Sequence, residues 1–242
     1  MIMARSFLFH IVYCIWAFLM CFAFLPSLFL PFWASNLVAR VWTSSIYFFL
    51  RFICKLTYRI EGMDIIPKGP VIIASKHQSV WETLFFPYQL KRSTIILKKE
   101  LFWLPFFGWY AKKYGAIGIK RSGGASTIRK LIKEARAHAL AGRSIVIFPE
   151  GTRTQPGKIG VYHSGVAALY KNLKIPVVPV ALNSGLYWPR RKLIRRAGVI
   201  TLRFLPPIPP GLPRHEFMGR LQSDIEAAQE ELCDLKYQSK NL

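Results

Sequence analysis

The stretch Val71-Ile-Ile-Ala-Ser-Lys-His-Gln-Ser-Val-Trp-Glu82 decides how the middle of this chain is expected to fold. It begins with Val71–Ala74, a short run of apolar and mostly β-branched side chains that is typical of a buried strand. A polar turn follows, and from Trp81 onward large apolar side chains recur at the spacing of an amphipathic helix. The pattern therefore predicts a strand, a turn at the edge of a sheet, and a helix.

His77 lies in that turn, and Glu82 follows five residues later in the predicted helix. α/β proteins tend to place their chemistry where strands end. A histidine with a carboxylate nearby can take a proton from a hydroxyl, because the carboxylate selects the imidazole tautomer and stabilises the imidazolium. Ser79-x-x-Glu82 is also a capping box, with Ser79 as N-cap and Glu82 reaching back to its amide. Both interpretations stay open, since one carboxylate can serve both roles at different oxygens.

Strands alternate with helices through most of the remaining sequence. Apolar runs predict further strands at residues 94–97, 115–121, 144–148, 177–182 and 199–204, and amphipathic patterns predict helices at 126–141, 162–173 and 217–235. Alternation of this kind predicts an α/β fold with a mixed, largely parallel sheet flanked by helices.

The N-terminal region is apolar and is expected to associate with a membrane. Residues 6–34 contain no Asp, Glu, Lys or Arg, and Ser6–Leu25 is long enough for a helix to cross the hydrocarbon core. A cleaved signal peptide fits less well, because the apolar region is too long and no small-x-small cleavage site follows. Asn36–Tyr58 has the pattern of an interfacial amphipathic helix or of the returning arm of a hairpin. We therefore expect residues 1–59 to anchor the chain and residues 60–242 to form a globular domain.

Charge and hydropathy together point to an anionic membrane surface. The net charge is +22 while 52% of the residues are hydrophobic. The cations are not accompanied by a recognisable nucleic-acid-binding motif. Positive charge after the apolar run places the remainder of the chain on the cytoplasmic side, as at a bacterial-type inner membrane. Residues 152–214 contain no Asp or Glu, and the basic cluster Arg190–Arg196 is interpreted as a contact with anionic lipid.

A second polar motif follows the strand predicted at residues 144–148. Phe148-Pro-Glu-Gly-Thr-Arg153 supplies a carboxylate at Glu150, a flexible glycine at Gly151 whose amide can approach a ligand, and a guanidinium at Arg153.

With both motifs in view, the chain resembles the glycerolipid acyltransferases, specifically the 1-acylglycerol-3-phosphate (lysophosphatidic acid) acyltransferases. Their four blocks occur in order as His77–Glu82, Gly115–Arg121, Phe148–Arg153 and Val177–Leu182, and the resemblance covers roughly residues 60–204. One departure stands out: the first block of the family usually ends in Asp, whereas this chain has Glu82, giving an HX4E motif. The resemblance implies that residues 60–242 are the acyltransferase domain.

The implied reaction is direct acyl transfer that yields phosphatidic acid for phospholipid biosynthesis. His77 would take the proton from the 2-hydroxyl of lysophosphatidic acid, with Glu82 as its orienting carboxylate. The residues implied to bind the substrate phosphate are Arg121 and Arg153, with Lys120 and Lys98 as weaker candidates. Backbone amides near Gly151 and Thr152 would stabilise the oxyanion, and Glu150 would brace the turn or Arg153.

The acyl donor is expected to be acyl-CoA or acyl-carrier protein, and the basic cluster at 190–196 is an alternative docking site for an acidic carrier protein. No His or Cys pair has zinc spacing, so we expect no metal and no resident cofactor. The four cysteines are expected to be reduced packing residues. Two alternatives remain open: an acyltransferase for another lysolipid, such as a lyso-aminolipid, and a non-catalytic basic module that binds membranes.

Overall fold

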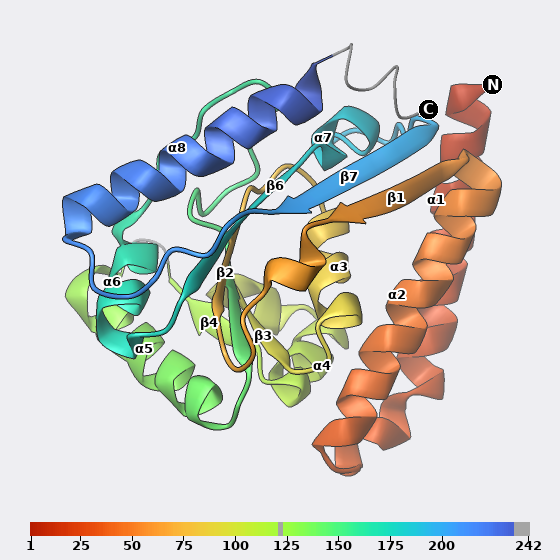
Figure 1. The fold of residues 1–242 in the computed structure, drawn as a ribbon. Coiled ribbons are helices and arrows are strands. Elements are labelled where there is room, and N and C mark those ends of the chain that lie inside the picture. The colour runs from red at the N-terminus through yellow and green to blue at the C-terminus, as the bar shows by residue number, and fades with distance from the viewer. Residues whose placement is uncertain (121–122, 235–242) are drawn as a thin grey trace.

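The computed structural model describes residues 1–120 and 123–234, in which helices and strands alternate (Figure 1). The helices are α1 (Ile2–Ala23), α2 (Phe32–Cys54), α3 (Trp81–Gln89), α4 (Phe107–Tyr114), α5 (Gly124–Leu140), α6 (Ser164–Leu173), α7 (Ser184–Tyr187) and α8 (Arg214–Cys233). The strands are β1 (Leu56–Glu61), β2 (Ile72–Ser75), β3 (Ser93–Lys98), β4 (Ile117–Ile119), β5 (Ser144–Ile147), β6 (Val177–Leu182) and β7 (Gly198–Phe204). Three short 3₁₀ turns, η1 (Leu25–Phe29), η2 (Met63–Ile65) and η3 (Lys99–Trp103), complete the described elements.

The described strands form one sheet in the order β1-β7-β6-β2-β5-β3-β4. Neighbouring strands are parallel except for the antiparallel pair β6 and β7. β2 lies in the middle, where Ile73 is in register with Val146 of β5 and Val178 of β6. The predicted mixed, largely parallel α/β sheet is therefore confirmed.

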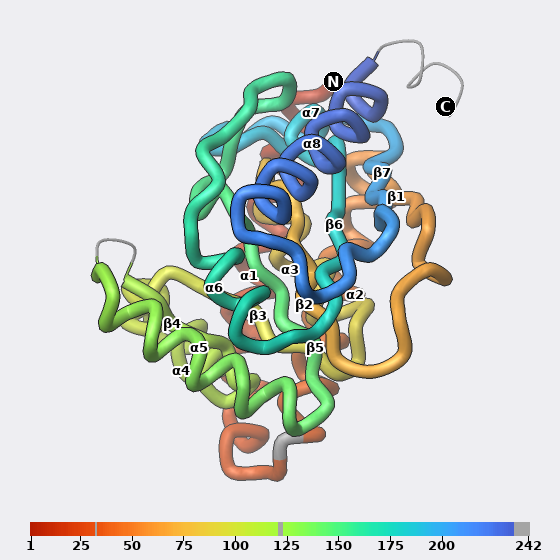
Figure 2. The backbone as a smooth tube through the Cα atoms, turned by 60° about the vertical axis from the view of Figure 1, so that its left-hand side comes forward, coloured from red at the N-terminus to blue at the C-terminus, as the bar shows by residue number. Residues whose placement is uncertain are grey.

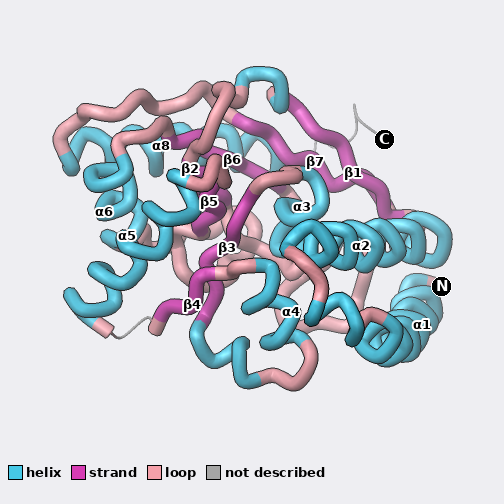
Figure 3. Tube along the Cα trace, turned by 90° about the horizontal axis from the view of Figure 1, so that it is seen from below, coloured by secondary structure: helices cyan, strands magenta, loops and turns pink. Residues whose placement is uncertain are grey.

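Helices cover both faces of the sheet and create two apolar cores (Figure 3). Successive side chains of a strand point to opposite faces, so Ile73 packs with α2 and α3, while Ile72 and Ala74 pack with α5, α6 and α8. Strands buried on both faces read as continuous apolar runs, which is why Val71–Ala74 lacks polar alternation.

The N-terminal helices form a hairpin that lies along one side of the domain (Figure 1). Both α1 and the stretch Trp33–Cys54 are long and apolar enough, by length and composition, to cross a membrane. α1 leaves most of its large apolar side chains exposed, yet Phe9 is fully buried against the domain.

The second apolar segment is shorter than the sequence predicted. A helix or hairpin arm was expected through Tyr58, but α2 ends at Cys54 and Leu56–Glu61 forms β1, in parallel register with β7. Lys55 turns the chain with a left-handed φ of 55°, after which Leu56 faces the core and pairing with β7 supplies the backbone hydrogen bonds. β1 thus crosses the predicted boundary between residues 59 and 60.

The topology brings three turns together at one edge of the sheet. β6, β2 and β5 are adjacent and parallel, so the segments that follow Leu182, Ser75 and Ile147 all leave the sheet at the same end. The long connection from β5 to α6 rises to that end, where α7 also lies (Figure 2). This edge corresponds to the position where open α/β sheets bind their ligands.

Candidate active site

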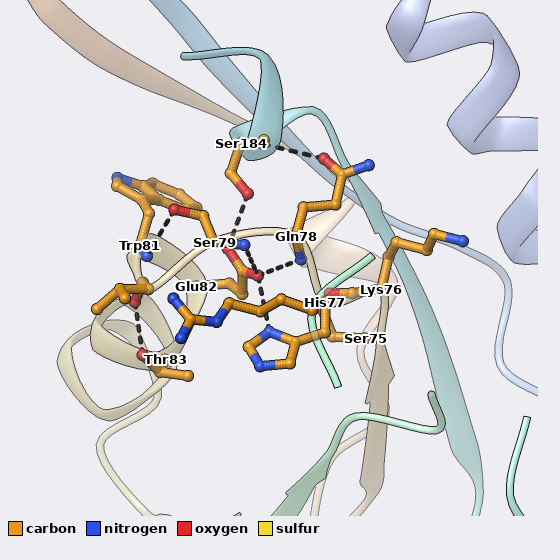
Figure 4. Close-up of polar contacts among 12 residues, drawn as sticks. Ser75, Lys76, His77, Gln78, Ser79, Trp81, Glu82, Thr83 and Ser184 are labelled. Carbon is orange, nitrogen blue, oxygen red and sulfur yellow. Dashed lines mark hydrogen bonds and ion pairs between the residues drawn. The ribbon is translucent and has the colours of Figure 1, made fainter. Parts of the chain in front are cut away.

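His77 and Glu82 face each other across the turn between β2 and α3 (Figure 4). The distance from His77 Nδ1 to Glu82 Oε1 is 2.9 Å. The helix begins at Trp81, so its first turn carries Glu82 back over the strand end. Glu82 is completely buried, and the imidazole of His77 retains 11% of its side-chain surface. A buried carboxylate therefore fixes a histidine that solvent can still reach.

Three further donors hold the Glu82 carboxylate in place. Its Oε1 also accepts the backbone N–H groups of Gln78 and Ser79, each at 2.6 Å, and its Oε2 accepts the hydroxyl of Ser184 at 2.8 Å. The expected reach of Glu82 back to the Ser79 amide is present. The same oxygen, rather than a different one, also contacts the histidine, because three donors converge on Oε1 and α7 occupies Oε2 with Ser184.

The imidazole ring of His77 is fixed from a second side by an aromatic ring. Phe148, at the end of β5, stacks on it with ring centroids 4.1 Å apart and an interplanar angle of 18°. Among the described residues, the ring hydrogen-bonds only through Nδ1. This arrangement leaves Nε2 as the ring nitrogen that can meet a ligand.

Glu150, which was expected to brace the turn or Arg153, contacts the main chain of the histidine. Its Oε2 accepts the His77 backbone N–H at 3.0 Å, and its Oε1 accepts the Thr154 hydroxyl at 3.0 Å. Thr154 N–H in turn donates to the His77 carbonyl at 2.8 Å. Gly160 closes over this carboxylate so tightly that a Cβ there would lie 2.5 Å from Glu150 Oε1. The two motifs are thus joined through backbone and side chain.

The turn after β5 determines what its amides can contact. Gly151 has a φ of 61°, a left-handed conformation that glycine adopts without strain. Its N–H donates to the Phe148 carbonyl at 2.9 Å and is therefore engaged inside the turn. Thr152 follows on the exposed side of the same turn.

A buried lysine connects this site to the C-terminal helix. Lys76 is 1% exposed, and its ammonium lies 2.9 Å from Glu150 Oε1 and 2.6 Å from Glu226 Oε1 of α8. The third donor of the ammonium reaches the Lys158 carbonyl at 3.3 Å. Tyr162 donates to Glu226 at 3.1 Å, and burial together with that carboxylate raises the pKa of the phenol, so the hydroxyl remains a donor.

Arg153 lies at the wall of a cleft of about 730 Å³ that begins beside Gln78. Burial lowers the pKa of Arg153; Arg190 and Arg191 lower it further, whereas Glu82 raises it. The guanidinium is therefore within electrostatic reach of both the carboxylate and the basic cluster. Arg190 donates to the Arg153 carbonyl at 2.8 Å, which ties the cluster to the motif.

The other predicted phosphate-binding residues lie further along the sheet edge. Lys120 is exposed directly after β4, which is separated from β5 by β3. Lys98 is half-exposed and lies 3.9 Å from Glu100. Arg121 lies outside the described residues. Within the described ranges, no group of three or more His, Cys, Asp or Glu side chains is placed to hold a metal ion.

Sequence reasoning missed the residues that hold the site together, namely Lys76, Gln78, Thr154, Ser184 and Glu226. Two signals were available: Lys76 is a cation that directly follows a buried strand, and Ser184 lies two residues after the fourth block. Glu226 gave no such signal, because it lies 150 residues from Lys76 on a helix whose other acids are exposed or partly exposed.

Comparisons with known proteins show which family the chain resembles. Residues 57–183 match the family model described as Acyltransferase. The 1-acyl-sn-glycerol-3-phosphate acyltransferase of Pseudomonas aeruginosa is 36% identical over 172 residues, covering 71% of this chain and 67% of that protein. The enzyme of the same name from Cocos nucifera is 29% identical over 151 residues, or 62% of this chain and 49% of that protein, so the chain spans about half of that relative.

Two further matches are an acyltransferase that acts on a different lysolipid and a solved structure. The lyso-ornithine lipid O-acyltransferase of Pseudomonas aeruginosa is 27% identical over 197 residues, covering 74% of this chain and 75% of that protein. The crystal structure of the 1-acyl-sn-glycerophosphate (LPA) acyltransferase PlsC from Thermotoga maritima superposes with a TM-score of 0.76 at 20% identity. That match covers 96% of this chain and 99% of the other, so the two share the whole fold, including the N-terminal helices.

Proposed function

The chain belongs to the acyltransferase family, and on that premise we propose that it transfers a fatty acyl group from an acyl thioester to the 2-hydroxyl of 1-acylglycerol-3-phosphate. The product of this transfer is phosphatidic acid. The observation that carries the proposal is the contact of 2.9 Å between His77 Nδ1 and the buried Glu82 carboxylate. The named relatives that are 1-acylglycerol-3-phosphate acyltransferases supply the choice of acceptor.

In this mechanism His77 is the general base. Its Nε2 takes the proton from the acceptor hydroxyl, the alkoxide oxygen forms a bond to the thioester carbonyl carbon, and the C–S bond then breaks. The leaving thiolate takes the proton from the imidazolium, so no covalent enzyme intermediate forms. Glu82 stabilises the imidazolium and fixes the tautomer with the proton on Nδ1. General base catalysis contributes about 10²–10⁴-fold, and positioning of the two substrates supplies much of the rest.

The remaining roles follow the chemistry of the groups. Arg153 is proposed to bind the acceptor phosphate, together with Lys120 and Arg121. The Thr152 amide is the better oxyanion candidate, because the Gly151 N–H already donates within its turn. Glu150 is proposed to hold the His77 backbone in place.

We propose that the exposed apolar surfaces of α1 and α2 anchor the chain in a membrane, with residues 60–242 as the acyltransferase domain on the cytoplasmic side. Anchoring of this kind brings the site to acceptors that are themselves membrane lipids. The acyl donor is acyl-CoA or acyl-carrier protein.

The test is acyl transfer from a labelled acyl thioester to lysophosphatidic acid in membranes that carry the wild type, His77→Ala or Glu82→Gln. We expect His77→Ala to lose about 10²–10⁴-fold in kcat. His163→Ala is the matched control, since His163 is an exposed histidine at the start of α6. Full activity of His77→Ala would overturn the mechanism and favour the non-catalytic module.

A second arm separates the acceptors, because the lyso-ornithine lipid O-acyltransferase is also a relative. If the acceptor is a phosphate monoester, Arg153→Gln raises its KM about 10- to 100-fold, as the loss of a charge-assisted hydrogen bond implies. Transfer to lyso-ornithine lipid by the wild type, with none to lysophosphatidic acid, would reject the proposed acceptor.

A further inference from the structure

The cleft beside Gln78 concentrates positive charge far beyond what one acceptor phosphate requires. Five of its lining residues are cationic, and none is acidic: Arg153, Arg190, Arg191, Lys192 and Arg196. No carboxylate close in sequence offsets the charge of these cations, since residues 152–214 contain no Asp or Glu. Burial and the mutual repulsion of Arg153 with Arg190 and Arg191 are the largest effects that lower the Arg153 pKa. Such a cleft favours a ligand with several negative charges.

Two donors at this cleft also lack acceptors. Gln78 Nε2 and Arg190 Nε are buried without a hydrogen-bond partner among residues 1–120 and 123–234. The oxygen of the Gln78 side-chain amide accepts the Gly185 N–H at 3.0 Å, and this contact fixes the orientation of the amide. The amide nitrogen of Gln78 therefore remains available to donate to a ligand. Buried donors in native proteins are nearly always paired, and unpaired ones at a cleft indicate a ligand that brings acceptors.

The shape of the cleft distinguishes a ligand site from a lipid-contact patch. A flat membrane surface does not enter a concavity of about 730 Å³, whereas pockets of this size are typical for small ligands and cofactors. The wall of the cleft also has apolar surface between the cations, contributed by Pro156, Leu186 and Pro189. The cleft therefore suits a ligand that has apolar parts as well as phosphates.

We propose that this cleft binds the nucleotide end of a coenzyme A thioester, with Arg190, Arg191 and Arg196 contacting its phosphates. This inference deepens the proposed function and rests on it for the transfer of the acyl group. The coenzyme A nucleotide carries a 3′-phosphate monoester, with a charge of about −1.5 to −2, and a diphosphate bridge that is also anionic. The thioester arm then leads past Gln78 toward His77, which directly precedes Gln78 in the chain.

The rival ligands match the cleft less well. The acceptor carries one phosphate monoester, for which Arg153 and the cations after β4 suffice. A carrier protein delivers its thioester on an arm with a single phosphodiester, and its folded body does not enter the cleft. The charge and the concavity together favour coenzyme A.

The first experiment compares acyl-CoA with acyl-pantetheine, which has the same thioester but no nucleotide. For full-length Arg191→Gln and Arg196→Gln, we expect the ratio of kcat/KM for acyl-CoA to that for acyl-pantetheine to fall about tenfold or more. Arg214→Gln, the same exchange at an exposed position at the start of α8, keeps the wild-type ratio. An unchanged unfolding temperature verifies that each variant is folded.

Three results would overturn the proposal. One is an unchanged ratio in both cleft variants. Another is a rise in KM for lysophosphatidic acid in place of acyl-CoA, which would assign the cleft to the acceptor. The third is loss of binding to anionic phosphatidylglycerol vesicles with the ratio intact, which would make the cluster a lipid contact.

A binding measurement separates this inference from the proposed function. Adenosine 3′,5′-bisphosphate is titrated into His77→Ala protein in nanodiscs of neutral phosphatidylcholine, with inorganic phosphate as the comparison probe. We expect the bisphosphate to bind, and the addition of Arg191→Gln to weaken that binding about tenfold or more. Binding to this protein, together with no transfer to lysophosphatidic acid by the wild type, would retain the cleft and reject the proposed function. Absence of binding, together with full transfer by the wild type, would reject the cleft alone.

Discussion

The Glu150 carboxylate accepts the backbone N–H of His77 at 3.0 Å, so a single hydrogen bond joins the two most distinctive motifs of the chain. The two glutamates of the site therefore have different contacts: Glu82 touches the ring of His77, and Glu150 touches its main chain. Glu150 is in turn paired with Lys76, which reaches α8. The position of the histidine thus depends on a buried ion network as well as on its own turn.

The network predicts a large stability loss in Lys76→Met. The substitution removes the ammonium between Glu150 and Glu226 and leaves a buried carboxylate without its counter-charge. We expect the free energy of unfolding to fall by about 3–5 kcal/mol, measured by chemical denaturation in detergent. Lys98→Met is the control, since its half-exposed pair with Glu100 is worth at most about 1 kcal/mol. Equal losses in both variants would contradict the network.

Ser184→Ala is predicted to lower kcat through Glu82. The Ser184 hydroxyl is the donor to Glu82 Oε2, and its loss frees the carboxylate to rotate away from the ring. We expect kcat to fall about tenfold with little change in KM for the acceptor, because the change disturbs orientation and not binding. Ser79→Ala makes the same exchange at a hydroxyl that, within the part of the chain that the structure describes, accepts only the Trp81 N–H. A fall in kcat of the same size there would mean that helix stability, and not Glu82, is responsible.

Glu82→Asp tests the departure of this chain from its family's usual residue. The shorter side chain withdraws the carboxylate by about 1.5 Å, one C–C bond, which exceeds what contacts of 2.6–2.9 Å tolerate within hydrogen-bond range. We expect a loss of about tenfold in kcat, measured in the same transfer assay. Wild-type activity in Glu82→Asp would show that the turn adjusts freely to either acid.

The sequence predicted those parts of the site that neighbours along the chain determine. His77 and Glu82 are five residues apart on a strand, turn and helix whose patterns are unambiguous, so their meeting followed from local structure. The convergence of three strand ends also followed, because parallel strands put their carboxyl ends at one edge. Local signals were sufficient for the fold class and for the principal candidate residues.

Long-range partners were beyond local patterns. Lys76 and Glu226 meet only because α8 packs on the sheet, and no periodicity in either segment encodes that contact. β1 was missed because Leu56–Glu61 follows a helix directly and continues its mixture of aromatic and basic residues. That one oxygen of Glu82, Oε1, contacts both the His77 ring and the backbone amides before the helix could not be predicted either, because it depends on atomic positions.

Phe9 provides the final prediction, because it couples the anchoring helix to the basic cleft. Its ring is fully buried, packs edge-on against Trp188 at 5.8 Å, and lies 5.4 Å from the guanidinium carbon of Arg195. Ser6, one turn earlier in α1, accepts the Arg195 backbone N–H at 2.9 Å. α1 therefore packs directly on the segment that carries the cleft cations.

We expect Phe9→Ala to reduce the free energy of unfolding by about 3–5 kcal/mol and to raise the KM for acyl-CoA, since the cleft segment loses its support. Phe7→Ala, on the same helix but 61% exposed, should change stability far less. Both variants should sediment with membranes, because the other exposed apolar side chains of α1 remain. If Phe9→Ala instead left the membrane fraction with its stability intact, α1 would act as an anchor alone and not as part of the domain's core.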